Sequence, residues 1–274
     1  MIFRVESNGR SLYCSKAGEG ELLLLIHGVV SDSDYFADAV SWLSGNYTVV
    51  TYDRIGYTRS EASPGEDYSV SAQAEDAARI IRFLGMGPAL VVGCSAGGII
   101  ALELARKRPE LVKKLLLHEP PLGAGEEPAK RLSEWRGTLR EDADEKRPVR
   151  AMIHFIKALG GVDKRAPKRS LEAQKRDLEN LDVFLYHEME DMLSYLPENA
   201  GKIHLRMPCF IAVGEKDEGG LFAGAAADTA DLLSATLLRA PGYHNFASEL
   251  PRDFAVFVTG VMNLKTESGD RKTL

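Results

Sequence analysis

The chain has 274 residues, of which 45% are hydrophobic and 27% are charged, a composition typical of folded globular proteins. Its formal net charge of −6 argues against a nucleic-acid partner, because phosphates favour a basic protein surface. The longest apolar run near the start, Leu22 to Ile26, is well below the roughly 18 apolar residues that a membrane span needs. We therefore expect neither a nucleic-acid-binding protein nor a membrane-spanning one.

The cysteines and histidines bear on the compartment and on metal binding. Cys14, Cys94 and Cys209 are odd in number, widely spaced and free of a CxxC pattern, which favours a reducing compartment and argues against a disulfide framework or a zinc site. The six histidines include no HxxxH pair. Residues 1–6 show no basic segment leading into an apolar one. We therefore expect a cytoplasmic protein without a secretory signal, a metal or a cofactor.

The first half of the chain alternates short apolar runs with amphipathic segments, which is typical of a mostly parallel sheet covered by helices on both faces. An opening hairpin is predicted at residues 3–7 and 12–16, with Asn8-Gly9 as its turn. Buried strands are predicted at residues 22–26, 47–52, 89–92 and 114–118. Helices are predicted at about residues 33–44, 71–84 and 96–108, the second with Ser69 or Ser71 as its N-cap.

The pattern changes after Leu122. Residues 123–204 lose the strand signal and become rich in charge, while apolar residues recur at helical spacing, which predicts an insertion of about four helices with solvated charged faces. Strands resume at residues 209–213 and 235–238, and a last helix is predicted at 252–263. We therefore predict a core of residues 1–122 and 205–264, a helical insertion at 123–204 and a polar tail at 265–274.

A possible nucleophile lies in the segment Gly93-Cys94-Ser95-Ala96-Gly97-Gly98. The segment follows a buried strand and opens a helix, the context in which a G-x-S-x-G motif forms a sharp strand-to-helix turn. Such a turn needs small neighbours, and the start of the helix brings backbone N–H groups to the serine oxygen. Ser95 is therefore the candidate nucleophile.

Together with three other motifs, this segment makes the chain resemble the α/β-hydrolase superfamily. His27-Gly28-Val29-Val30 matches the family's oxyanion-loop motif, and Pro241-Gly242-Tyr243-His244 lies where the family places its catalytic histidine. Residues 53–60 match the family's D-x-R-G-x-G-x-S loop in part, because Thr58 stands where a second glycine is usual. The resemblance implies an eight-stranded, mostly parallel sheet with a helical cap after the sixth strand.

The same resemblance assigns roles to residues. Ser95 would be the nucleophile and His244 its general base, and the backbone N–H groups of Val29 and Ala96 would form the oxyanion hole. His27 would orient its loop rather than take part in the chemistry.

The third member of the triad has two candidates. Asp217, in Gly214-Glu215-Lys216-Asp217, matches the acid that the family usually places after the seventh strand, and is the first choice. Glu119 directly follows the sixth strand, and the chain resembles lactonases of the zearalenone-degrading type at Gly93-Cys94-Ser95 and His118-Glu119-Pro120. Both strand ends can reach the histidine from one edge of the sheet, so both acids stay open.

The resemblance implies a hydrolase of carboxylic esters or lactones that needs no cofactor. A serine at the turn, in place of the aspartate of dehalogenases and epoxide hydrolases, favours acyl transfer. Alternatives are carbon–carbon bond hydrolysis of a diketone by the same residues, and a ligand receptor that turns over slowly. Aromatic residues of the insertion predict a largely apolar pocket for a small molecule: Trp135, Phe155, Phe184, Tyr186 and Tyr195.

Overall fold

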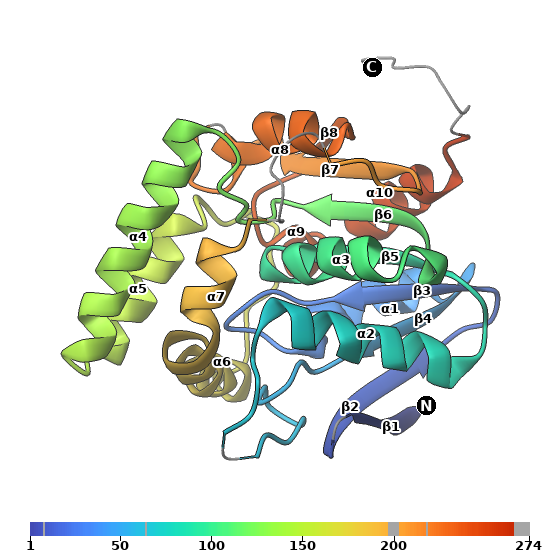
Figure 1. Cartoon of the computed structure of the whole chain (residues 1–274), viewed down its shortest axis with the longest axis horizontal. Helices are drawn as coiled ribbons and strands as arrows, with labels where there is room; N and C mark the ends of the chain where they lie inside the picture. The colour runs from blue at the N-terminus through green and yellow to red at the C-terminus, as the bar shows by residue number, and fades with distance from the viewer. Residues whose placement is uncertain (8, 64, 197–202, 218, 266–274) are drawn as a thin grey trace.

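The computed structural model describes residues 1–7, 9–63, 65–196, 203–217 and 219–265. Among them, eight strands form one sheet in the order β1-β2-β4-β3-β5-β6-β7-β8 (Figure 1). The strands are β1 (Ile2–Ser7), β2 (Arg10–Ala17), β3 (Glu21–Ile26), β4 (Tyr47–Tyr52), β5 (Ala89–Cys94), β6 (Val112–His118), β7 (Cys209–Gly214) and β8 (Thr236–Ala240). β1 and β2 pair antiparallel, as do β2 and β4, and all the other pairs are parallel. The predicted eight-stranded, mostly parallel sheet is confirmed.

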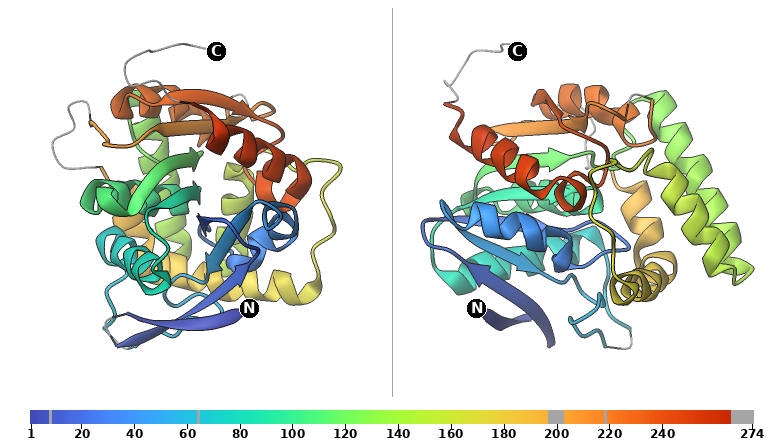
Figure 2. Two further views of the ribbon diagram at one scale, coloured as in Figure 1. Left: turned by 90° about the vertical axis from the view of Figure 1, so that its right-hand side faces the viewer. Right: turned by 180° about the vertical axis from the view of Figure 1, so that it is seen from behind.

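Helices cover both faces of the sheet, which is why the parallel strands are continuous apolar runs. Every residue of β4, β5 and β7 is buried. One face packs against α2 (Val70–Leu84), α3 (Ala96–Lys107) and α8 (Ala226–Leu233), and the other against α1 (Ala37–Leu43), α9 (Phe246–Glu249) and α10 (Pro251–Asn263) (Figures 1 and 2). Short 3₁₀ turns are η1 (Ser33–Phe36), η2 (Pro109–Leu111) and η4 (Ala223–Ala225).

The predicted elements of the core differ from the observed ones by one or two residues at their ends. Ser69 caps α2, since its side chain accepts a hydrogen bond from the backbone N–H of Ala72 at 3.2 Å. Gly85 ends that helix with a left-handed φ of 62°. The hairpin forms as expected, although Asn8 of its turn lies outside the described residues, as do residues 266–274 of the predicted tail.

The segment between β6 and β7 is helical, as predicted. It contains α4 (Glu126–Asp144), α5 (Pro148–Ala158), α6 (Leu171–Val183), the π-helical turn η3 (Phe184–Glu188) and α7 (Met189–Ser194). These helices lie beyond the edge of the sheet at which the parallel strands end (Figure 1). They share a separate apolar cluster that includes Leu139, Phe155 and Phe184 and that also takes in Val30 of the core. Within the described ranges, no helix is both long and apolar enough to cross a membrane.

A buried polar network joins the inserted helices to the core. Arg54, which follows β4, donates from Nη1 and Nη2 to the two carboxylate oxygens of Glu188, both at 2.9 Å, and both side chains are 0% exposed. Gln73 donates to the same carboxylate at 3.0 Å, and the hydroxyl of Tyr57 donates to it as well. The prediction that charged residues of the insertion face solvent is therefore wrong for Glu188, whose charge is matched by Arg54 inside the protein.

Candidate active site

Ser95 occupies a sharp turn between β5 and α3. Its φ of 53° and ψ of −128° are unusual for a residue with a side chain, and such strain is typical of functional turns. The turn closes because its neighbours are glycines. A Cβ atom on Gly93 would lie 2.3 Å from the carbonyl oxygen of Gly97, and one on Gly97 would lie 2.2 Å from that of Ile26. The motif therefore forms the turn that the sequence predicts.

Glu119 is fixed at the end of the neighbouring strand β6. The backbone N–H of Ser95 donates to the carbonyl of His118 at 2.8 Å, and that of Glu119 donates to the carbonyl of Ala212 at 3.0 Å. Glu119 also has a positive φ, of 44°. The ends of β5, β6 and β7 thus hold Ser95 and Glu119 on the same edge of the sheet.

His244 lies in the loop between β8 and α9 and bonds to Glu119. Nδ1 of His244 donates to Oε2 of Glu119 at 2.6 Å, and the backbone N–H of Gly214 donates to Oε1 at 2.8 Å. Glu119 is 0% exposed and His244 is 4% exposed. Burial alone would raise the pKa of Glu119, but the hydrogen bond from His244 and the nearby charges of both histidines outweigh it and lower the pKa to about 2. Glu119 is therefore ionised and holds one tautomer of His244.

Asp217, the first choice for the acid, lies nearby without reaching His244. Among the described residues, no hydrogen bond joins Asp217 to His244, and its Oδ2 is buried with no partner. Burial and the negative charge of Glu119 raise the pKa of Asp217 to about 6. The structure thus brings Glu119, and not Asp217, into contact with the histidine.

His27 and Gly28 shape the loop that faces Ser95. Nε2 of His27 accepts from the backbone N–H of Arg54 at 3.0 Å, and Nδ1 lies 2.8 Å from the carbonyl oxygen of Gly28. Burial and the charge of Arg54 lower the pKa of His27 to about 4, which keeps the ring neutral. A Cβ atom on Gly28 would lie 3.0 Å from that of Ser95, so the loop approaches the serine closely. These contacts fit a loop-orienting role for His27.

The two predicted oxyanion donors lie beside Ser95. Val29 and Ala96 line a small hollow with Ser95, closed by aromatic side chains that include Trp135 and Phe222. The backbone N–H of Ala96, at the first position of α3, has no acceptor within its own helix. Val29 and Ala96 thus both lie next to Ser95.

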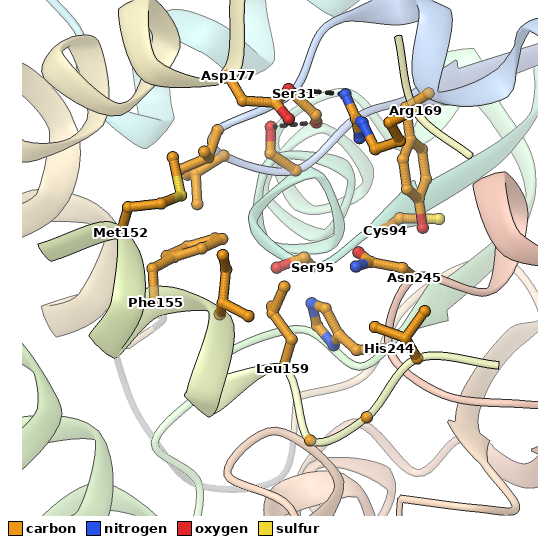
Figure 3. Close-up of a pocket in the computed structure, with 18 of the residues that line it drawn as sticks. Ser31, Cys94, Ser95, Met152, Phe155, Leu159, Arg169, Asp177, His244 and Asn245 are labelled. Atoms are coloured by element: carbon orange, nitrogen blue, oxygen red, sulfur yellow. Dashed lines mark hydrogen bonds and ion pairs between the residues drawn. The ribbon is translucent and has the colours of Figure 1, made fainter. Parts of the chain in front are cut away.

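A cavity of about 410 Å³ lies over Ser95 and His244, between the core and the inserted helices (Figure 3). No hydrogen bond joins Ser95 to His244 in the described part of the chain, and catalytic contacts are often loose without substrate. The ring of Phe222 lies 4.5 Å from that of His244, centroid to centroid. Apolar side chains of α5 and its following loop line the cavity: Met152, Phe155, Ile156, Leu159 and Val162.

The prediction of an aromatic pocket holds in part. Phe155, Trp135 and Phe184 line the cavity or the hollow beside it. Tyr186 is instead 52% exposed, and the hydroxyl of Tyr195 donates to Glu103 at 2.5 Å, outside both.

Sequence reasoning missed the polar end of the cavity. Ser31, Arg169, Gln174 and Asp177 line this end. In Figure 3, Arg169 and Asp177 lie across the cavity from His244. Arg169 donates from Nη2 to Oδ1 of Asp177 at 2.8 Å. Charged residues near a helix start are normally solvent-facing, so the sequence held no signal for this pair. Within the described residues, no cluster of three or more His, Cys, Asp or Glu side chains could hold a metal ion.

Comparison with known proteins identifies the family. Residues 21–247, well over half of the chain, match the model of the alpha/beta hydrolase fold. The chain therefore belongs to the alpha/beta hydrolase family, and the predicted resemblance is confirmed.

The relatives are distant or matched over part of their length. The chain is 39% identical to the uncharacterized hydrolase YraK of Bacillus subtilis over 115 residues, which cover 42% of each protein. The chain spans less than half the length of the curated relatives it matches. An esterase of Exiguobacterium antarcticum superposes with a TM-score of 0.72 at 20% identity, covering 96% of this chain and all of that one. Est816, described as an N-acyl homoserine lactone degrading enzyme, gives 0.72 at 20% identity over 94% and 99% of the two chains. These likenesses establish the fold.

Proposed function

We propose that the protein is a serine hydrolase that cleaves a carboxylic ester or a lactone, with Ser95 as nucleophile, His244 as general base and Glu119 as the acid. The observation that carries this proposal is the buried bond from His244 to Glu119, beside the strained turn that presents Ser95. The turn around Ser95 alone would fit many family members. Glu119 is ionised and accepts two hydrogen bonds, and this fixed negative charge makes His244 a competent base.

The chemistry follows from these positions. Nε2 of His244 takes the proton of the Ser95 hydroxyl as its oxygen attacks the substrate carbonyl. Glu119 stabilises the imidazolium that forms, and the backbone N–H groups of Val29 and Ala96 donate hydrogen bonds to the developing oxyanion. His244 then gives its proton to the leaving alcohol, and water releases the acyl group from Ser95. No step requires a cofactor.

The inserted helices would form the substrate-selecting cap. They close the cavity above Ser95 with mostly apolar side chains, which suits the aliphatic part of an ester or lactone. We propose that this cap comprises residues 123–204. We further propose that the protein is cytoplasmic. An esterase and a lactone-degrading enzyme among proteins of the same fold are consistent with this substrate class.

A fluorophosphonate probe tests the nucleophile directly. The folded protein should label at Ser95, identified by mass spectrometry of the modified peptide, and Ser95→Ala should not label. Cys94→Ala is a useful control, because its buried thiol lies next to Ser95 and should be irrelevant to labelling. Absence of the adduct from folded wild-type protein would refute the proposal.

A substrate panel separates the proposal from its alternatives. Some members of a panel of short esters, small lactones and macrocyclic lactones should be turned over, and a diketone should not. A fast burst followed by negligible steady turnover on every ester would instead favour the slow-turnover receptor. Cleavage of the diketone alone would favour carbon–carbon bond hydrolysis.

A further inference from the structure

We infer that Arg169 binds a carboxylate of the substrate, so that the preferred substrates are esters or lactones bearing an acidic group remote from the bond that is cleaved. This inference rests on the proposed function, because it names the substrate class of that same site. It concerns the polar end of the cavity, formed by Ser31, Arg169, Gln174 and Asp177.

Arg169 is the permanent cation of this cavity. Of the described residues that line it, the charged side chains are Arg169, Asp177 and, when protonated, His244. Arg169 and Asp177 lie away from Ser95 and His244, on the far side of the cavity in Figure 3. A substrate that fills the cavity therefore meets the nucleophile at one end and a guanidinium at the other.

The guanidinium keeps donors free for a ligand. Its one hydrogen bond among the described residues runs from Nη2 to Asp177, which leaves Nε and Nη1 unbonded. Gln174 donates to the backbone carbonyl of Arg169 at 3.1 Å and so holds the main chain in place, not the side chain. The side of an arginine fork that stays free suits a carboxylate, which accepts two parallel bonds.

The neighbouring groups leave the half-exposed side chain of Arg169, which pairs with Asp177, able to accept an anion at this end. Among the described residues, the hydroxyl of Ser31 makes only long contacts of 3.5 Å, to the carbonyl of Gly28 and to the ring of His27, so it can turn to donate to a ligand. Burial raises the pKa of Asp177 to about 6, against the opposing effect of Arg169. Asp177 can therefore take up a proton when a second carboxylate arrives. Asp32, a further acid near this end, is already paired with Arg176 at 2.8 Å.

The cavity wall between the two ends indicates what the rest of the substrate is like. Met152, Ile156 and Val162 are apolar, which requires an apolar spacer between the acidic group and the scissile carbonyl. A volume of about 410 Å³ is at the small end of ligand sites, so the whole substrate is compact. A half-ester of an aliphatic dicarboxylic acid has all of these features.

The test uses pairs of esters that differ in one terminal group. Methyl half-esters of the linear diacids from succinate to suberate are compared with methyl esters of monoacids of equal length, and with methyl 6-aminohexanoate. For the best spacer, wild-type protein should show a higher kcat/KM for the half-ester than for its neutral partner. Arg169→Gln should lower that ratio by roughly 10- to 100-fold, the loss expected for charge-assisted hydrogen bonds.

Controls separate recognition from structure. Arg140→Gln removes an exposed arginine that pairs with Glu190 outside the cavity, and it should leave the wild-type ratio unchanged. Arg169→Lys should recover part of the ratio. A wild-type ratio of one or less, a preference for the amino ester, or an unchanged ratio in Arg169→Gln would overturn the inference.

Binding provides a readout that does not depend on turnover. Ser95→Ala should bind methyl hydrogen adipate more tightly than methyl hexanoate by calorimetry, and Ser95→Ala with Arg169→Gln should lose that difference. Equal binding of both esters would overturn the inference even if Ser95 labels with fluorophosphonate. A binding difference without labelling would leave the carboxylate site standing and refute the hydrolase mechanism instead.

Discussion

Two carboxyl groups lie close to the ring of His244, and they differ in what they contact. Glu119 accepts from His244 and from the N–H of Gly214, whereas the buried Oδ2 of Asp217 has no partner among the described residues. A carboxylate that orients the histidine and stabilises its charged form is required for the base to work. Substituting each carboxylate in turn therefore shows which one orients and stabilises His244.

We expect Glu119→Gln to lower turnover of p-nitrophenyl acetate by about 10³- to 10⁴-fold, because the amide cannot stabilise the imidazolium. Asp217→Asn, the matched control, should lose less than about 10-fold, since it removes no bond to His244. Steady-state kcat of both variants, with circular dichroism to check folding, decides the matter. The opposite order would return the acid to Asp217.

His118 gives a second prediction, on acid stability. In the part of the chain that the structure describes, both of its ring nitrogens are buried without a partner. Burial and the charge of His244 lower its pKa to about 4, although the charge of Glu119 opposes this shift. An unfolded histidine titrates near pH 6.5, so the unfolded chain binds the proton first and stability falls as the pH drops from about 6.5 to about 4. Above that window the contribution of the neutral ring is complete.

We expect His118→Phe to remove this loss. Phenylalanine has a similar shape and suits the ring of Phe246, 5.9 Å away. Between pH 7.5 and pH 5, the free energy of unfolding of the variant should gain about 2 kcal/mol relative to wild type. Urea unfolding at the two pH values measures the shift, and parallel pH dependences of the two proteins would contradict the prediction.

At the scale of elements, the turn between β5 and α3 depends on glycines for steric room. A Cβ atom on Gly97 would lie 2.2 Å from the backbone carbonyl of Ile26, which cannot move without distorting β3. Gly137, inside α4, has nothing within 4 Å of the same position. A side chain at Gly97 would therefore collide with the backbone, whereas one at Gly137 would meet open space.

Gly97→Ala should cost several kcal/mol of stability or prevent folding, in the range of other severe steric changes. Gly137→Ala should stabilise the protein by about 0.5–1 kcal/mol, because alanine loses less entropy in a helix. Melting temperatures of the two variants would show the contrast. Similar small effects from both would mean that the turn relaxes more easily than its contacts indicate.

The sequence predicted the elements of the core because each one carries its own pattern. Apolar runs mark β3 to β8, and the motif around Ser95 is local in the chain. Contacts between distant segments leave no such pattern. Arg54 and Glu188 are 134 residues apart, and the choice between Glu119 and Asp217 depends on which of two adjacent strand ends brings its side chain to His244. Thr58 adopts a φ of 42°, so it takes the glycine-like conformation of its loop despite having a side chain.

At the scale of the whole molecule, the Arg54–Glu188 network joins the core to the inserted helices. Removing one member of a buried pair leaves the other charge uncompensated, which typically costs about 3–5 kcal/mol. Exposed pairs contribute about 1 kcal/mol or less. Arg140 and Glu190 form such an exposed pair within the inserted helices.

We expect Glu188→Leu to lower the free energy of unfolding by about 3–5 kcal/mol, and Arg54→Met combined with Glu188→Leu to recover much of that loss. Glu190→Gln should cost less than about 1 kcal/mol. Urea unfolding of the four proteins, wild type included, completes the comparison. A loss from Glu188→Leu no larger than that from Glu190→Gln would show that the network adds little to stability.

The same network limits how this protein could be recombined with its relatives. Exchanging helical insertions between members of a fold family is a natural route to hybrid enzymes with altered selectivity. If α4 to α7 were transplanted onto a sheet that lacks counterparts of Arg54, Tyr57 and Gln73, Glu188 would lose its three partners on the core side. Such a hybrid would bury an unpaired carboxylate between the sheet and the helices, so those three residues have to be transferred together with the helices.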